Sequence, residues 1–184
     1  MPRLSSDELD AFLDEPGHLL RVASVDGDGW PRVVPLWFVR DGHELVFTPR
    51  SAAVLLANVR RDPRLALSVD EDAIPYRKLS VQAPARIVRD IGEDDEWRDL
   101  YRTIAKRYIP APEADAYVDG TIDQPRALLA VPLGGDGVRT STWRMPVPGE
   151  DPTGIWHRRY YAEGTRLARR ATTSSSDETS SGST

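Results

Sequence analysis

The fold is decided by residues 18–70, which read HLLRVASVDGDGWPRVVPLWFVRDGHELVFTPRSAAVLLANVRRDPRLALSVD. Three segments of this stretch alternate or nearly alternate apolar and polar residues: His18 to Val25, Arg32 to Val39 and Glu44 to Thr48. This pattern is typical of β-strands that bury one face. Because Asp26-Gly-Asp-Gly29 and Asp41-Gly42 accept the positive φ of tight turns, we expect both connections to be hairpins.

A helix and a further strand complete the stretch. Ser51 can cap a helix that continues to Arg60, since apolar residues recur on one face and Asp62-Pro63 is typical of a helix end. Arg64 to Asp70 then places its apolar residues on one side, which indicates another half-buried strand.

The segments on either side extend this pattern. Leu4 to Asp14 is expected to be a helix capped by Ser5 or Ser6, and Pro84 indicates an edge or a bulge in a strand from Lys78 to Val88. We also expect helices at Glu93 to Tyr108 and Pro112 to Val118, and strands at Arg126 to Pro132 and Val138 to Arg144. The last two strands would form the closing hairpin of a barrel.

The composition limits the classes of function. The chain has 184 residues, of which 40% are hydrophobic, and a net charge of -5, which fits one globular domain with its own core. It has no cysteine, so disulfides, thiolate metal sites and a cysteine nucleophile are excluded. The slightly negative net charge gives no indication of nucleic-acid binding. Neither a long apolar run nor an apolar signal core occurs, so we expect a cytoplasmic protein with no membrane segment.

Residue types alone indicate no catalytic motif. No two histidines are spaced as a metal-binding pair, and the sequence has neither a Gly-rich phosphate loop nor a nucleophilic triad. We therefore predict no metal site and assign no catalytic residue.

The C-terminal part of the chain has a different character. We expect one domain over residues 1–170, with a C-terminal strap from about residue 145, and a disordered Ser/Thr-rich tail over residues 171–184. The strap contains Trp156-His-Arg-Arg-Tyr-Tyr161, in which His157 could be an axial haem ligand or a proton donor. Its aromatic and arginine neighbours favour instead a strap that docks on a partner subunit.

The order of the segments and their sequence motifs resemble those of a known family. The matching stretches are Arg21 to Gly29, Pro31 to Phe38, Asp41-Gly42, Phe47-Thr48 and Asn58 to Arg64. Their succession at these spacings resembles the flavin and deazaflavin oxidoreductases of the pyridoxamine 5'-phosphate oxidase-like superfamily. A looser match from Leu79 to Val88 and from Gln124 to Trp143 extends the resemblance over most of the chain.

The resemblance implies a fold and an assembly. The family fold is mainly β, a six-stranded split β-barrel of Greek-key type with flanking helices. Its members form homodimers, and the interface between subunits creates two equivalent clefts. A homodimer with a small-molecule substrate is therefore expected here.

The resemblance also implies where a cofactor binds. The strand that matches Val33, Val34, Pro35, Leu36 and Trp37 lines the cofactor ring. A planar ring needs such an apolar wall, whereas a phosphate needs cations, hydroxyls or a helix N-terminus. The segment that binds the phosphate matches Thr48, Arg50, Ser51, Leu55 and Asn58. From the residues alone, Thr48 and Ser51 are better explained as a strand end and a helix cap, and Trp37 as a core residue.

Leu55 departs from the family pattern. Relatives that hold a phosphorylated cofactor usually carry lysine at this place, three residues before the asparagine, and Ala52 to Ala57 are all apolar here. A buried phosphate normally needs a cation or several backbone donors. Arg60, Arg61 and Arg64 follow the segment but are explained as solvated charges at a helix end.

The function implied by the resemblance is that of an oxidoreductase with FMN or coenzyme F420 as cofactor. Hydride would pass between the ring and a small, largely apolar substrate, and the protein would position both and exclude water. One alternative is a split-barrel protein that has lost the phosphorylated cofactor and performs cofactor-free chemistry or binds haem. Another is a non-enzymatic carrier or sensor of a small molecule.

Overall fold

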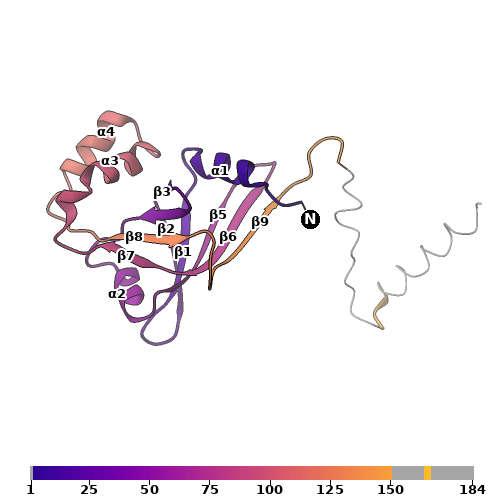
Figure 1. Ribbon diagram of the computed structural model, residues 1–184, viewed down its shortest axis with the longest axis horizontal. Helices are drawn as coiled ribbons and strands as arrows, with labels where there is room; N and C mark the ends of the chain where they lie inside the picture. Colours follow the sequence, from indigo (N-terminus) through magenta and orange to yellow (C-terminus); the bar gives the residue numbers. More distant parts are fainter. Residues whose placement is uncertain (1, 151–163, 167–184) are drawn as a thin grey trace, which may run out of the picture. The chain divides into compact units, whose positions relative to one another are not determined.

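Two antiparallel β-sheets share one apolar core (Figure 1). The computed structural model describes residues 2–150 and 164–166, and both sheets lie in the unit Pro2–Met145. The described residues beyond Met145 belong to a second unit. His157, most of the predicted strap and the predicted tail lie outside the described residues.

Each sheet is built from strands that are far apart in the sequence. The first has the order β2-β1-β5-β6-β9 and is formed by β1 (Leu20–Val25), β2 (Pro31–Leu36), β5 (Arg64–Asp70), β6 (Arg77–Pro84) and β9 (Arg139–Arg144). The second has the order β3-β4-β8-β7 and is formed by β3 (Phe38–Asp41), β4 (Glu44–Phe47), β7 (Arg86–Arg89) and β8 (Leu128–Pro132). The two hairpins predicted at the Asp-Gly turns are present, since β1 pairs with β2 and β3 pairs with β4 in antiparallel register. The predicted closing hairpin is wrong, because β8 pairs with β4 and β7 in the second sheet whereas β9 pairs with β6 in the first.

This mainly β architecture confirms the predicted fold class, but the number of strands differs from the six that were expected. The described residues contain nine strands. Two of the predicted strands each contribute to both sheets and are divided where the chain crosses over. Arg32 to Val39 divides at Trp37 into β2 and β3, and Lys78 to Val88 divides at Ala85 into β6 and β7. Pro84 ends β6 opposite Arg64, so the predicted irregularity is the crossing from one sheet to the other.

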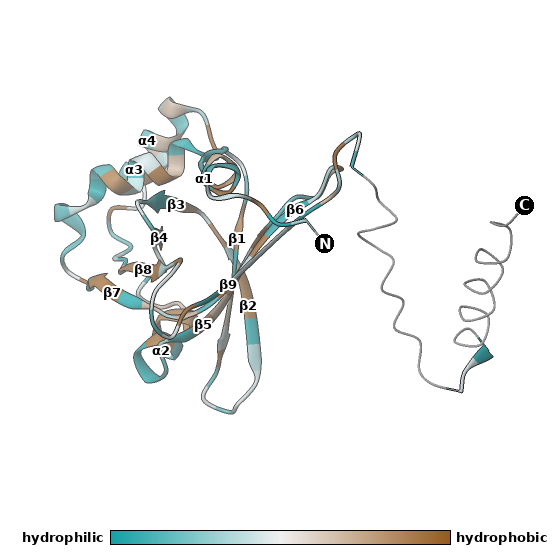
Figure 2. Cartoon of the chain, turned by 45° about the vertical axis from the view of Figure 1, so that its right-hand side comes forward, coloured by the Kyte–Doolittle hydropathy of each residue, from teal (hydrophilic) through white to brown (hydrophobic). Residues whose placement is uncertain are grey.

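The core lies between the two sheets. Val22, Leu67 and Val81 of the first sheet cluster with Leu45 and Phe47 of the second, and each is at most 4% exposed. Figure 2 shows apolar residues on strands of both sheets. The alternation in the sequence therefore gave the inward face of these strands correctly.

Helices cover the edges and the outer face of this core. α1 (Ser6–Asp14) begins at a capping box in which the Glu8 amide donates to Ser5 Oγ at 3.2 Å, so Ser5 and not Ser6 is the cap. α3 (Arg98–Lys106) and α4 (Ala111–Asp119) pack on the outer face of the second sheet, where Val46 meets Tyr101 and Val118. The predicted helix from Glu93 is interrupted, because a 3₁₀ turn (Asp94–Glu96) precedes α3.

α2 (Val54–Arg61) begins later than predicted. Its N-cap is Ala53, which has no side chain able to cap, so the prediction that Ser51 caps this helix is wrong. The Ser51 amide instead donates to the Pro125 carbonyl at 2.8 Å, which holds this residue in a bridge between two chain segments. None of the helices in the described part of the chain is long and apolar enough to cross a bilayer.

Candidate active site

A groove of about 840 Å³ lies beside the first sheet. β2 and Trp37 form one side of its lining, and the end of β4 and the start of α2 contribute the segment from Thr48 to Leu55 without Ser51. Tyr101 of α3, Tyr117 of α4 and Arg126 complete the lining. A volume of this size is typical of small-molecule sites.

Every residue of the predicted ring wall lines this groove. Val33, Val34, Pro35, Leu36 and Trp37 all contribute to the lining. β2 is the outer strand of its sheet, and within the described residues it pairs with β1 alone, which explains why proline is accepted there. The side chain of Val33 is unusually open for a strand valine, since this residue is 64% exposed. The wall is therefore apolar, extended and accessible, as a planar ring requires.

Trp37 belongs both to the groove and to an aromatic cluster. Its ring stacks on Tyr108 with centroids 5.2 Å apart and planes inclined by 7°, and it meets the edge of Tyr117 at 5.5 Å. The Tyr108 hydroxyl donates to the His18 carbonyl at 2.7 Å and accepts from the Phe38 amide at 3.1 Å. These contacts hold the indole in place, so the partly buried Trp37 packs against the helical cluster and still presents surface to the groove.

The predicted phosphate segment is only partly in the groove. Thr48, Arg50 and Leu55 line it, whereas Ser51 and Asn58 do not. Asn58 is buried, and its Nδ2 donates to Ser24 Oγ at 2.9 Å, which ties α2 to β1. Asn58 thus has a structural role. Its contact with the groove is indirect, through Ser24, which is one of the lining residues.

The first turn of α2 offers backbone donors to the groove. Among the described residues, no oxygen accepts a hydrogen bond from the amides of Val54 and Leu55, because a helix leaves the amides of its first turn without internal partners. The helix N-terminus also carries a partial positive charge. Leu55 itself is 5% exposed and packs in the main core, so the place of the expected lysine has become part of the core.

Two tyrosines and two arginines form a polar corner of the groove. The Tyr117 oxygen accepts from Arg50 Nη2 and from Arg126 Nη2, both at 3.3 Å. The Arg126 guanidinium lies 4.5 Å over the ring of Tyr101, and its Nη1 donates to the Thr48 carbonyl at 3.0 Å. We call Arg50, Tyr101, Tyr117 and Arg126 the arginine–tyrosine corner.

The two phenols of this corner have opposite pKa shifts. Burial raises the pKa of Tyr101 above its ordinary value, and the hydrogen bond that it shares with Tyr117 adds to this effect. Burial would also raise the pKa of Tyr117, but hydrogen bonds with Tyr101 and Arg50 and the charge of Arg126 outweigh it and lower that pKa. Tyr117 is therefore the more acidic phenol and the better candidate to exchange a proton with a bound ligand.

Sequence reasoning did not find three members of this corner. Tyr101 and Tyr117 were assigned only to predicted helices, and Arg126 only to a predicted strand and to the looser part of the resemblance. No local signal could have found them, because Tyr117 comes next to Trp37, and Arg126 next to Thr48 and Tyr101, only in the folded chain.

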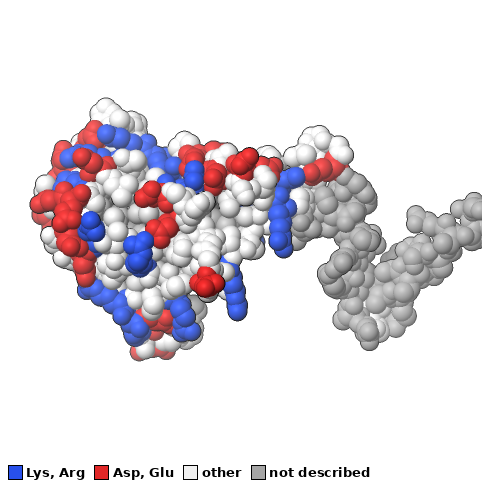
Figure 3. Space-filling view, viewed as in Figure 1, with Lys and Arg blue, Asp and Glu red and all other residues white. Residues whose placement is uncertain are grey.

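Most other arginines of the described residues are paired with carboxylates. Arg77, for example, contacts both Glu15 and Glu71. Glu15, His18 and Glu71 lie close enough together to hold a cation, but Arg77 already supplies the positive charge there. Figure 3 shows the resulting surface, on which acidic and basic side chains are interspersed.

Comparisons with known proteins place the chain in a family. The model of the pyridoxamine 5'-phosphate oxidase family matches residues 5–132. Among curated proteins none matches. A solved F420 reductase is 26% identical, covers 71% of this chain and 94% of its own, and superposes with a TM-score of 0.51.

Two further solved structures share the fold at lower identity. The FAD and haem binding protein of Mycobacterium smegmatis is 22% identical over 85% of this chain and 79% of its own, with a TM-score of 0.57. The haem storage protein of Vibrio cholerae is 20% identical over 76% of this chain and 96% of its own, with a TM-score of 0.56. Since the family model matches well over half of the sequence, the chain belongs to the pyridoxamine 5'-phosphate oxidase family.

Proposed function

We propose that this chain is an oxidoreductase that holds a flavin, as FMN, or the deazaflavin F420 against β2 and acts on a small, largely apolar substrate. The observation that carries the proposal is the accessible apolar wall from Val33 to Trp37, which has hydrogen-bond donors and cations at its margin. A planar, anionic cofactor needs this combination. The similarity to an F420 reductase supports the deazaflavin, and the FAD and haem binding protein supports a flavin.

The residues of the groove suit such a cofactor. A bound flavin or deazaflavin would supply the hydride chemistry. Val33 and Leu36 would exclude water from one face of the ring, and the stacked Trp37 would fix its position. The first-turn amides of α2 and the guanidinium of Arg50 would neutralise an anionic group.

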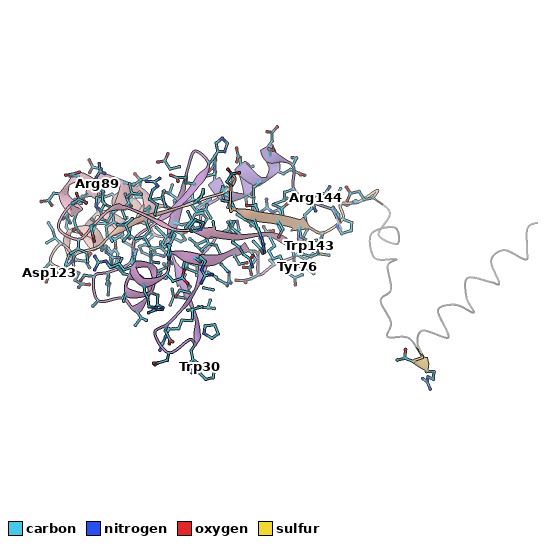
Figure 4. All side chains as sticks on the ribbon, turned by 60° about the horizontal axis from the view of Figure 1, so that its bottom comes forward. Trp30, Tyr76, Arg89, Asp123, Trp143 and Arg144 are labelled. Carbon is cyan, nitrogen blue, oxygen red and sulfur yellow. The ribbon has the colours of Figure 1, made fainter. Side chains whose placement is uncertain are left out.

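We also propose a homodimer. Three apolar side chains of the β1–β2 hairpin and its flanks are largely open to solvent: Trp30 is 72% exposed, Val33 64% and Val25 48%. Figure 4 shows Trp30 at the tip of this hairpin, where it projects away from the body. Exposed apolar patches of this kind mark interaction surfaces. Sedimentation equilibrium should give twice the chain mass at micromolar concentration, and a single-chain mass would contradict the dimer.

Haem is the second candidate ligand, and one observation favours it. Tyr117 presents a phenol of lowered pKa to the groove, and a phenolate is one of the protein ligands of haem iron. The similarity to a haem storage protein supports this second candidate. Of the described histidines, neither His18 nor His43 lines the groove.

An absorbance spectrum of the purified protein distinguishes these candidates. Titration with FMN and with F420 should show saturable binding of at least one of them at micromolar concentration, with a shifted ring absorbance. A Soret band on titration with haem, in the absence of binding by either ring cofactor, would replace the redox proposal with haem binding. The absence of any spectral change would contradict both the redox function and haem binding.

A further inference from the structure

Arg50 and Arg126 are direct cross-strand neighbours. They form an isolated antiparallel bridge, in which the Ala127 amide donates to the Pro49 carbonyl at 3.1 Å and the Ser51 amide to the Pro125 carbonyl at 2.8 Å. Like charges directly opposite each other in an antiparallel pair repel and destabilise it. The bridge therefore favours a negative charge beside these two guanidiniums.

The described part of the chain supplies no carboxylate at this place. Among the described residues, no carboxylate oxygen lies within 4.0 Å of the guanidinium of Arg50 or of Arg126. Asp94 contacts this segment, but its Oδ1 accepts from the Arg126 backbone amide at 2.6 Å and not from the side chain. The arrangement differs from that of Arg77, which contacts two carboxylates.

Arg126 is also incompletely satisfied. It is only 8% exposed, and its buried Nε has no hydrogen-bond partner among the described residues. Its other guanidinium contacts are to neutral groups, namely the Thr48 carbonyl, the Tyr117 hydroxyl and the ring of Tyr101. A buried cation without a counter-charge is unfavourable, because the contacts with neutral groups replace only part of its hydration.

All of these groups face the same groove. Arg50, Arg126, Tyr101 and Tyr117 line it together with the apolar wall of β2. Arg50 is exposed and so can move to meet a ligand, whereas Arg126 is fixed by its contacts. A ligand lying along β2 can therefore extend a charged group toward both arginines.

We propose that the arginine–tyrosine corner is an anion-binding subsite that takes the phosphate or carboxylate group of an organic ligand whose apolar body lies along β2. The position of the apolar body rests on the proposed function. The anion belongs either to the cofactor, as a phosphate, or to the substrate, as a carboxylate.

The subsite can be tested without any ring cofactor. The ultraviolet absorbance of ionised phenols is followed during a pH titration, with and without inorganic phosphate. An anion beside Tyr117 disfavours its phenolate, so phosphate should move the first phenol ionisation to higher pH. Tyr117→Phe should remove this first ionisation and its response to phosphate.

Matched variants then show whether the two arginines bind the anion. Calorimetric titration with inorganic phosphate should give an affinity that falls at least about tenfold in Arg50→Gln and in Arg126→Gln. Arg64→Gln removes the same charge at a side chain that is 84% exposed and paired with Asp62, so it should bind phosphate like the unchanged protein. Because Arg50 is exposed, its variant tests the proposal even if Arg126→Gln does not fold. Equal phosphate affinity in Arg50→Gln, Arg64→Gln and the unchanged protein would overturn the subsite.

A pair of ligands with the same ring identifies the source of the anion. FMN carries a phosphate that riboflavin lacks, so a subsite for the cofactor predicts that Arg50→Gln weakens FMN and leaves riboflavin unchanged. A subsite for the substrate predicts that both affinities stay unchanged while phosphate binding falls. If riboflavin binds but phosphate does not, the subsite is wrong and the proposed function stands. If phosphate binds but neither FMN, riboflavin nor F420 does, the proposed function is wrong and the subsite stands.

Discussion

Phe47→Ala is expected to lower the free energy of unfolding by about 3–5 kcal/mol. Phe47 is fully buried, lies opposite Phe38 in the β3–β4 ladder and belongs to the core between the two sheets. Truncating the ring removes its transfer free energy and leaves a cavity that the two sheets cannot close completely. Chemical denaturation of the unchanged protein and of the variant gives the difference directly.

Two further substitutions separate this effect from a general loss of apolar surface. Phe47→Leu should destabilise the protein less than Phe47→Ala, because it leaves a smaller cavity. Ile122→Ala should change the free energy of unfolding by no more than about 0.5 kcal/mol, since Ile122 is 58% exposed. A loss below about 1 kcal/mol for Phe47→Ala would show that the two sheets do not share one packed core.

Leu55→Lys is expected to strengthen the binding of FMN by about 1–3 kcal/mol, or roughly 5- to 150-fold, if the phosphate lies at the start of α2. Leu55 lines the groove, and a lysine there can bury its carbon chain while its ammonium group reaches the phosphate. Equilibrium titration with FMN, followed by the absorbance of the flavin, measures the change. Riboflavin, which lacks the phosphate, should show no gain.

The same substitution has a stability penalty that needs its own control. Leu55 is 5% exposed and packs in the core, so a lysine should lower the melting temperature of the protein without ligand. Leu55→Met keeps the size and apolar character of the side chain and should leave the FMN affinity unchanged. If Leu55→Lys and Leu55→Met bind FMN equally, the phosphate does not lie at the start of α2.

The alternation of apolar residues predicted the strands well but not their division between sheets. Leu65, Leu67 and Val69 recur at every second position and are buried in the structure, because period two describes a strand with one face in a core. In β4 the intervening Val46 is buried as well, against the helical cluster, so that strand alternates only in part. The crossing at Trp37 has no such signal. The chain stays extended on both sides of it, and only the choice of pairing partner changes.

The candidate site was predictable along β2 and much less so elsewhere. Val33 to Trp37 were placed by the family resemblance, and they line the groove. Ser51 was wrongly expected to cap α2, because the bridge to Pro125 holds its backbone in place and delays the start of the helix. Arg126 is buried beside Thr48 through contacts between segments far apart in the chain, which residue patterns within one segment do not encode.

The two sides of the groove differ in how tightly they are coupled to the barrel. β2 packs through Val34 and Leu36 against the main core, and only Trp37 separates it from Phe38, so changes there disturb the barrel itself. Tyr101 and Tyr117 belong instead to the cluster that α3 and α4 form on the outer face of the second sheet. Ligand preference can therefore diversify through the helical side while the strand side stays constant, which suits a scaffold that serves many small molecules.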